Sequence, residues 1–445
     1  MDFKKFNEQI RRVTQKFNLT DYEILLTITT TLTAHIENRE ITLQLENDIF
    51  SGSLRGLKAD KLSFVPFTEP SLGLLELGIR VAQNSALPAP LTAFATIPAH
   101  LPVPAAFDPQ IVRLLNNPAL VQRFAEDIVR QAYETNRIET LKGLVQVRNE
   151  TKLLATRHSP EAVCADRTAF SVFVDVNTKD FAYFATRKLP ELDELTGLAA
   201  QVANALPTYE TTPENEGLKG KIVPAILDPI FTEEMIRKLV AEHLYAAAAQ
   251  EGMSKYQIGT QIMSPLITLW DDASCPFGST TFPVDDEGTP VRKNLVVKAG
   301  VLQHYLYDRT TAQRDSVEST GNGRRRPVLI EEENEAPVRC TINDIFISPG
   351  ETELDQMLKT VDAGILIRLL LGFHTANRTT GDFTNTLYIG RIIKNGEITA
   401  LPHPGRWAVK GNALKIMKNI AAVSKETCAT GSGNLPWLKT EITVT

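Results

Sequence analysis

The sequence predicts an α+β protein, and three features of the 445-residue chain carry this prediction. Residues 22–48 are rich in Thr, Ile and Leu and alternate in part, which is typical of two or more strands. Residues 109–136 repeat apolar side chains every three or four positions, which is typical of helices. Turn signals then recur densely after residue 252, as in "DDEGTP", "VKAGV" and "IKNGEI". We therefore expect a mixed N-terminal region of helices and antiparallel strands, followed by a mainly antiparallel β domain.

Composition places the chain among ordinary soluble proteins. Hydrophobic residues make up 43% and charged residues 22%, and the net charge is -6. A mild negative charge argues against a dedicated nucleic-acid binder, which would show a basic face. The best candidate for a membrane span, residues 363–373, is too short to cross a bilayer and carries Arg368, and the N-terminus lacks the apolar core of a signal peptide. We therefore expect a cytoplasmic protein that binds neither a membrane nor nucleic acid directly.

Four segments follow from the pattern along the chain: an N-terminal α+β subdomain (1–87), a linker or arm (88–109), a central α+β subdomain (110–215) and a C-terminal β-rich domain (216–445). The first segment opens with an amphipathic helix, whose apolar positions are Phe3, Phe6, Ile10, Val13 and Phe17. The many prolines of residues 88–109 forbid a continuous helix or a central strand. In the central segment we expect helices interrupted at Pro118, two strands joined by a turn over residues 168–189, and a helix near residues 192–206.

The four cysteines, Cys164, Cys275, Cys340 and Cys428, form no C-x-x-C pair. Reduced thiols in a cytoplasmic protein are the simplest interpretation. Cys275 or Cys428 would act as a nucleophile only beside a base and in a positive environment, and the sequence places no histidine next to either. An inert small side chain is the favoured interpretation.

Residues Arg324 to Arg326 form a basic run within "GNGRRRPVLIEEENE". Such a cluster can bind phosphates. Because four glutamates follow, a solvated loop that neutralises itself is the favoured interpretation. No P-loop and no G-x-S-x-G elbow accompanies it.

Residues 231–250 predict one alanine-rich helix that carries Glu242 and His243. A zinc-binding helix of a peptidase needs two histidines on one face, because the ligands must converge on a tetrahedral ion. This helix contains only one histidine. We therefore expect a buried packing helix, with residues 246–249 giving a smooth face of alanines.

Residues 270–445 carry the motifs of a known family. The blocks "DDEGTP", "GVLQHYLYDRTTA" and "STGN" occur in this order, followed by "GFHTANRTTGDFTNTLYIGRIIKNGEI" and "KETCATGSG". Together they resemble the C-terminal domain of the TldD/PmbA family, also known as modulators of DNA gyrase. Upstream of Trp270 the likeness is one of layout.

This resemblance implies a component of a cytoplasmic metallopeptidase that pairs a TldD-type with a PmbA/TldE-type subunit and acts on unfolded peptides. The TldD type carries H-E-x-x-x-H before the β-rich domain and a C-terminal cysteine as zinc ligands, where the metal would activate water. Residues 231–252 lack both histidines at that spacing, although Cys428 lies where the cysteine is expected. We therefore expect no catalytic residue and no metal site, with His243 and Cys428 as the remaining candidate ligands.

The sequence thus favours a non-catalytic PmbA/TldE-like subunit that binds peptide and supports a TldD-type partner, or pairs with a second copy of itself. Candidate contacts with peptide or partner are the residues on the family's most recognisable loops: Gly321, Asn322, Asn377, Gly381 and Asp382. The alternative for these residues is that they only satisfy turn geometry.

Two other functions stay open. One is an active metallopeptidase with atypical ligands, such as His243 or His304 with Cys428 and a carboxylate, which would require zinc. The other is a non-enzymatic modulator that binds gyrase or a toxin–antitoxin component.

Overall fold

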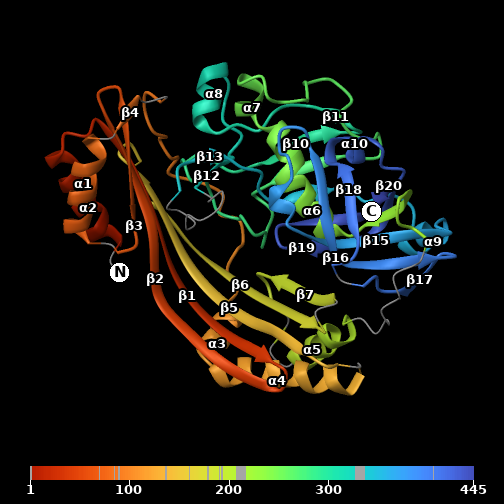
Figure 1. Ribbon diagram of the computed structural model, residues 1–445. Helices are drawn as coiled ribbons and strands as arrows, with labels where there is room; N and C mark the ends of the chain where they lie inside the picture. The colour runs from red at the N-terminus through yellow and green to blue at the C-terminus, as the bar shows by residue number, and fades with distance from the viewer. Residues whose placement is uncertain are drawn as a thin grey trace.

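The computed structural model describes the chain from residue 3 to residue 445, except for residues 70, 85, 89–90, 136–137, 160, 178–179, 190, 192–193, 207–216, 326–335 and 404. The fold is α+β, as predicted, with one large sheet in each half of the chain (Figure 1). Among the described residues, no helix is both long enough and apolar enough to span a bilayer.

The first half forms a seven-stranded antiparallel sheet with the order β4-β3-β2-β1-β5-β6-β7. Its strands are β1 (Asp21–Glu37), β2 (Glu40–Lys58), β3 (Lys61–Phe67), β4 (Leu87–Pro88), β5 (Leu141–Thr156), β6 (Val163–Val176) and β7 (Asp180–Thr186). β1 alone is long enough to extend about 55 Å, and the central strands curve as a band across Figure 1. The predicted strands of residues 22–48 and the predicted strand pair of residues 168–189 are confirmed; turn residues 178–179 lie outside the described part.

Helices cover this sheet at its two ends. They are α1 (Phe3–Lys16), α2 (Leu72–Asn84), α3 (Pro109–Leu115), α4 (Pro118–Thr135) and α5 (Leu195–Asn204). α1 and α2 bury Ile10 and Ile79 against one end, whereas α3, α4 and α5 pack over the other. The predicted interruption at Pro118 is confirmed, because proline is favoured at the first position of a new helix.

The proline-rich segment contains neither helix nor strand between residues 91 and 108. It is nevertheless packed: Phe94 lies in a small core with Leu57, and Ile97 packs with Leu25 of β1 and Phe282 of the second half. The predicted boundaries at residues 87 and 110 stay predictions. The strands before residue 89, β1 to β4, and the strands after residue 110, β5 to β7, belong to the same seven-stranded sheet.

The second half forms a mainly antiparallel sheet in which β14 pairs with β20, and β15 with β8, in parallel. Its strands are β8 (Lys221–Leu227), β9 (Leu269–Asp272), β10 (Lys293–Lys298), β11 (Val301–Leu302), β14 (Ile345–Ile347), β15 (Ala363–Leu371), β16 (Asp382–Lys394), β17 (Glu397–Ala400), β18 (Ala408–Asn412), β19 (Ala422–Thr430) and β20 (Gly433–Val444). Because β20 pairs with β8 as well as with β18, five of these strands close into a ring. A short ladder of β12 (Gly323–Arg324) and β13 (Arg339–Cys340) stands beside it.

The helical elements of this half are α6 (Pro229–Met235), η2 (Ile236–Val240), η3 (Ala241–Leu244), α7 (Ala246–Gln250), α8 (Arg309–Asp315), α9 (Leu354–Lys359), η4 (Phe373–Thr375) and α10 (Ala413–Lys418). α6 and η2 form the centre of the main core, where Phe231, Met235 and Ile236 are fully buried. The buried helix expected over residues 231–250 is therefore present in its first part.

The prediction of one continuous helix over residues 231–250 is wrong. Tyr245 is extended, at φ -86° and ψ 135°, and forms a bridge with Leu306. Leu306 donates its N–H to the carbonyl of Leu244 at 2.8 Å and accepts the N–H of Ala246 at 2.9 Å. These bonds to a distant segment replace the helical ones, so tertiary pairing outweighs the helix propensity of the alanines. Ala246 and Ala248 are buried, as expected for a packing face.

Candidate functional site

His243 is a buried side chain of η3 and is only 1% exposed. Its Nδ1 accepts the backbone N–H of Lys255 at 3.2 Å, and its ring packs edge-on against Tyr256 with centroids 5.6 Å apart. Burial, and to a smaller extent Lys255, lowers the pKa of His243, so the ring is neutral at pH 7. Its Nδ1 is occupied by a backbone donor and does not present a lone pair to an ion.

The other candidate ligands have different surroundings. The Sγ of Cys428 lies 3.4 Å from the carbonyl of Ala429, and the Nδ1 of His304 lies 3.0 Å from the carbonyl of Tyr305. Burial raises the pKa of Cys428, with Asp228 adding to the effect. In the part of the chain that the structure describes, no three His, Cys, Asp or Glu side chains gather in a way that could hold a metal ion. These side chains therefore do not fit the zinc centre of the TldD type.

Cys275 lies in an environment that disfavours a thiolate. Burial raises its pKa, and Asp272 and Asp344 add to the effect, with Lys293 opposing them. Since the thiolate is the nucleophile, a raised pKa makes this thiol less reactive at pH 7. All four cysteines carry free thiols.

Gly321 and Asn322 belong to a buried polar network. Asn322 is 0% exposed: its Nδ2 donates to Asp271 at 2.9 Å, and its Oδ1 accepts the hydroxyl of Thr320 at 2.6 Å. Gly321 has φ +77°, and a Cβ there would lie 3.1 Å from the carbonyl oxygen of Pro290. The local structure thus explains why a glycine and an asparagine occupy these two positions. Contact of either residue with a peptide remains a prediction.

Asn377, Gly381 and Asp382 form a turn at the start of β16, in which Asn377 and Asp382 are exposed and Gly381 is buried. The Oδ1 of Asn377 accepts the N–H groups of Thr379 and Thr380, both at 3.0 Å. Gly381 has φ +78°, and Asp382 accepts Nδ2 of Asn412 at 2.8 Å. The turn geometry explains these residue types, and a binding role for this exposed turn also stays a prediction.

The arginine run shows the clearest departure from expectation. A buried ion cluster joins the two halves, with Glu23, Arg55 and Lys152 from the first sheet and Asp286, Glu287, Arg324 and Arg325 from the second half. We call these seven residues the closed ion cluster. Each of their side chains is at most 6% exposed. The predicted solvated loop is therefore wrong for Arg324 and Arg325, whereas residues 326–335 lie outside the described part.

Every cation of the closed ion cluster has a carboxylate partner. Arg55 lies 3.0 Å from both Glu23 and Glu287, and Lys152 lies 2.6 Å from Asp286. Arg324 also pairs with Asp286, at 3.4 Å, and Arg325 pairs with Glu23. Buried charges persist only when they are paired. These guanidinium groups pair with carboxylates between the two halves, so they are not available to bind a phosphate.

A second ionic contact joins the halves at the start of β7. Asp180 is 0% exposed and accepts Nη1 of Arg368 at 3.1 Å and Nη2 of Arg391 at 2.8 Å. The guanidinium of Arg368 also lies 4.3 Å from the ring centroid of Phe181.

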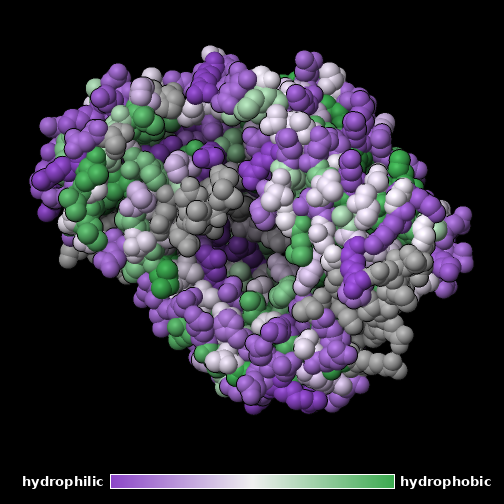
Figure 2. All heavy atoms as spheres, viewed as in Figure 1, coloured by the Kyte–Doolittle hydropathy of each residue, from purple (hydrophilic) through white to green (hydrophobic). Residues whose placement is uncertain are grey.

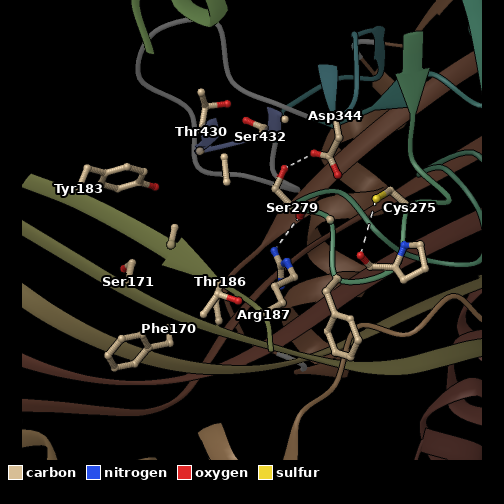
Figure 3. A pocket seen from close by; sticks show the side chains of 18 of the residues that line it. Phe170, Ser171, Tyr183, Thr186, Arg187, Cys275, Ser279, Asp344, Thr430 and Ser432 are labelled. Atoms are coloured by element: carbon tan, nitrogen blue, oxygen red, sulfur yellow. Dashed lines mark hydrogen bonds between the residues drawn. The ribbon is translucent and has the colours of Figure 1, made fainter. Parts of the chain in front are cut away.

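Between the first sheet and the second half lies a pocket of about 380 Å³, which we call the β7 pocket (Figure 3). It is lined by residues 169–171, Tyr183, residues 185–187, residues 275–279, Asp344, Phe346 and residues 429–433. β6 and β7 form one wall and the turn between β19 and β20 forms another. Figure 2 shows a hollow near the centre of this face of the molecule, between the two halves, where the deeper atoms are mainly hydrophilic.

Arg187 is the cationic group of the β7 pocket. It donates to the carbonyl oxygens of Thr168 at 3.0 Å and Ser279 at 2.7 Å, and Ser279 donates its hydroxyl to Asp344 (Figure 3). Burial lowers the pKa of Arg187 to about 9, with Arg167 adding to the effect and Glu150 opposing it. The guanidinium is therefore charged at pH 7.

An ion pair between Glu233 of α6 and Arg237 of η2 holds another wall of the β7 pocket in place. Glu233 accepts Nε of Arg237 at 2.7 Å, and Nη2 of Arg237 donates to the carbonyl oxygen of Ser432 at 2.9 Å. Arg237 also donates to the carbonyls of Ile342 and Asn343. Sequence reasoning missed Arg187, Asp344 and Arg237, because no short motif marks charged residues that meet only in the folded chain.

The chain belongs to the PmbA/TldA metallopeptidase family, since residues 219–445 match the model of that family's C-terminal domain. Over its whole length it shares the fold of TldE from Thermococcus kodakarensis, with a TM-score of 0.82, 19% identity and 99% of each chain covered. These comparisons confirm the resemblance seen in the sequence and the α+β fold.

Among curated proteins, the chain is 30% identical over 213 residues to the metalloprotease TldD homolog of Buchnera aphidicola, which is 47% of this chain and 42% of that protein. It is 22% identical over 258 residues to the metalloprotease PmbA homolog of the same species, which is 56% of this chain and 51% of that protein. The aligned part thus spans about half the length of these relatives or less. The comparisons support a peptidase-related role at the level of the family.

Proposed function

We propose that this chain is a PmbA/TldE-like subunit of a cytoplasmic peptidase system: it binds unfolded peptide and supports a TldD-type metalloprotease, without a metal centre of its own. The observation that carries this proposal is the chemistry of residues 231–250. That segment supplies one imidazole, His243, which is buried with its Nδ1 bonded to a backbone N–H. A tetrahedral zinc site needs three protein ligands and an open position for water.

Peptide binding is supported by the edge of the first sheet. β7 is the last strand in the sheet order, so one side of its backbone has no strand partner among the described residues. The β7 pocket lies along this strand. An extended peptide can add to such an edge through main-chain hydrogen bonds, which gives grip with little sequence preference.

The test is a peptide-cleavage assay of the chain alone, of a TldD-type partner from the same organism alone, and of the mixture. We expect no cleavage by the chain alone, and a mixture that differs from the partner alone in rate or product pattern. Metal analysis of the purified chain is expected to find less than stoichiometric zinc. Cleavage by the chain alone that a chelator abolishes would refute the proposal and favour the alternative with atypical ligands.

Matched variants separate the two possibilities further. His243→Ala and Cys428→Ser each remove one candidate ligand. In the mixture we expect both to retain activity once their folding has been checked by thermal melting. Co-purification from the native cell shows which protein the chain binds: a TldD-type peptidase, a second copy of itself, gyrase or a toxin–antitoxin component. Capture of gyrase or a toxin–antitoxin component, with no effect of the chain on peptide turnover, would contradict the proposal.

A further inference from the structure

The β7 pocket contains the guanidinium group of Arg187, which forms no ion pair with any residue that the structure describes. In the part of the chain that the structure describes, the hydrogen bonds of Arg187 go to two neutral carbonyl oxygens, and no carboxylate forms an ion pair with it. These two bonds occupy two of the five N–H donors of an arginine. The neighbouring cations differ, because Arg148 and Arg167 pair with Glu150 at 2.5 Å and 3.1 Å.

The local charge balance favours an anion. The charged groups with the largest effect on Arg187 are the cations Arg167 and Arg148 and the carboxylates Glu150 and Asp344. Counting Arg187 itself, these groups of the described residues comprise three guanidinium groups and two carboxylates. Since an unpaired charge away from bulk water is costly, a bound anion would be stabilised here.

The shape and chemistry of the pocket favour a carboxylate. The planar fork of arginine matches the two oxygens of a carboxylate or a phosphate. Asp344 lies in the same wall and would repel a doubly charged phosphate more strongly than a singly charged carboxylate. A volume of about 380 Å³ is at the lower end for ligand pockets, which leaves room for the end of a chain.

We propose that the β7 pocket binds a carboxylate at Arg187, and that this carboxylate is the free C-terminus of an unfolded peptide lying along β7. The inference rests on the proposed peptide-binding function and adds to it a preference for chain ends. The same carboxylate chemistry can also come from an acidic side chain, which the experiment has to distinguish.

The experiment measures binding of an N-terminally labelled, extended hexapeptide of alanine and threonine by fluorescence anisotropy, using the full chain. The peptide is used with a free C-terminal carboxylate, as its C-terminal amide, and as an amide that carries one internal glutamate. We expect the free acid to bind at least about tenfold more tightly than either amide, because a charge-assisted pair is formed only with the acid. Arg187→Met should bring the acid and the amide to within about twofold, whereas Arg187→Lys should keep part of the difference.

Arg130→Met is the matched control, since Arg130 is an exposed arginine on α4, away from the pocket, and should leave the tenfold difference unchanged. Thermal melting of each variant checks folding, and Arg187→Lys keeps the test valid if the methionine variant does not fold. Equal binding of acid and amide by the native chain would overturn the inference while leaving peptide binding intact. Tight binding of the glutamate amide would overturn the assignment to the C-terminus. Failure of all three peptides to bind would instead refute the proposed function.

Discussion

The closed ion cluster and the β7 pocket are both contacts between the two halves of the molecule, and both are rich in arginine. In the closed ion cluster every cation has a carboxylate within 3.4 Å and every side chain is at most 6% exposed. In the β7 pocket Arg187 is half-buried, lines a cavity and donates to neutral carbonyls. Buried charge alone therefore does not mark a functional site. Among the residues that the structure describes, the two regions differ in their ion pairs: every cation of the closed ion cluster has a carboxylate partner, whereas no carboxylate forms an ion pair with Arg187.

The strongest way to test this contrast is to remove a partner from the closed ion cluster. Glu23→Ala would leave Arg55 and Arg325 facing each other in a dry interface, so we expect a loss of about 3–5 kcal/mol in the free energy of unfolding. Urea denaturation at pH 7 measures it. As a control, Glu37→Ala removes an exposed pair with Lys142 and should leave the denaturation midpoint nearly unchanged. A similarly small effect for Glu23→Ala would show that the closed ion cluster does not stabilise the contact between the two halves.

Glu150 sharpens the comparison, because it is the carboxylate that pairs with Arg148 and Arg167, the cations near Arg187. Burial acts to raise the pKa of Glu150, but Arg167 and Arg148 outweigh it and lower the pKa to about 2 from the ordinary 4.5. A carboxyl group with a lowered folded-state pKa contributes stability that is present above pH 4.5 and is lost as the pH falls towards 2. We expect Glu150→Gln to cost on the order of 3 kcal/mol at pH 7, and this difference should shrink by more than half at pH 3.

Urea unfolding of both proteins at the two pH values gives the measurement. Glu37→Gln, which removes an exposed pair with Lys142, is the control and should change the free energy of unfolding little at pH 7. A difference that stays constant between pH 7 and pH 3 would mean that the charge of Glu150 is not what stabilises the fold.

The smallest expected effect concerns the exposed turn at residues 377–382. Asn377→Ala removes the acceptor for two backbone N–H groups and should cost about 1 kcal/mol, whereas Asn377→Asp keeps the acceptor and should cost little. Thermal melting combined with the peptide-binding assay decides the open question. If Asn377→Asp spares stability and binding alike, the residue serves turn geometry. If it weakens peptide binding while stability is unchanged, Asn377 contacts the ligand.

Much of the fold follows from local patterns in the sequence. The alternating run of residues 22–48 and the apolar periodicity around Pro118 report interactions within one element, so both were predictable. The break at Tyr245 was not, because it depends on a bridge to Leu306, about sixty residues further along the chain. Helix propensity carries no information about such a partner.

The candidate site was less predictable for the same reason. Counting the histidines of residues 231–250 led to the expectation of no zinc centre there, since metal ligation requires several donors, and this expectation stays a prediction. The buried state of Arg324 and Arg325 was missed because their partners, Asp286 and Glu23, lie far away in sequence. Arg187 was missed as well. A single arginine that follows a strand has no distinguishing sequence pattern, and only the fold places it in a cavity.

The closed ion cluster also limits how this protein can be divided. Three of its charges come from the first sheet and four from the second half. A fragment of either half would therefore keep charged side chains whose ion-pair partners lie in the missing half. We therefore expect the region matched by the family model, residues 219–445, to fold less stably without the first sheet.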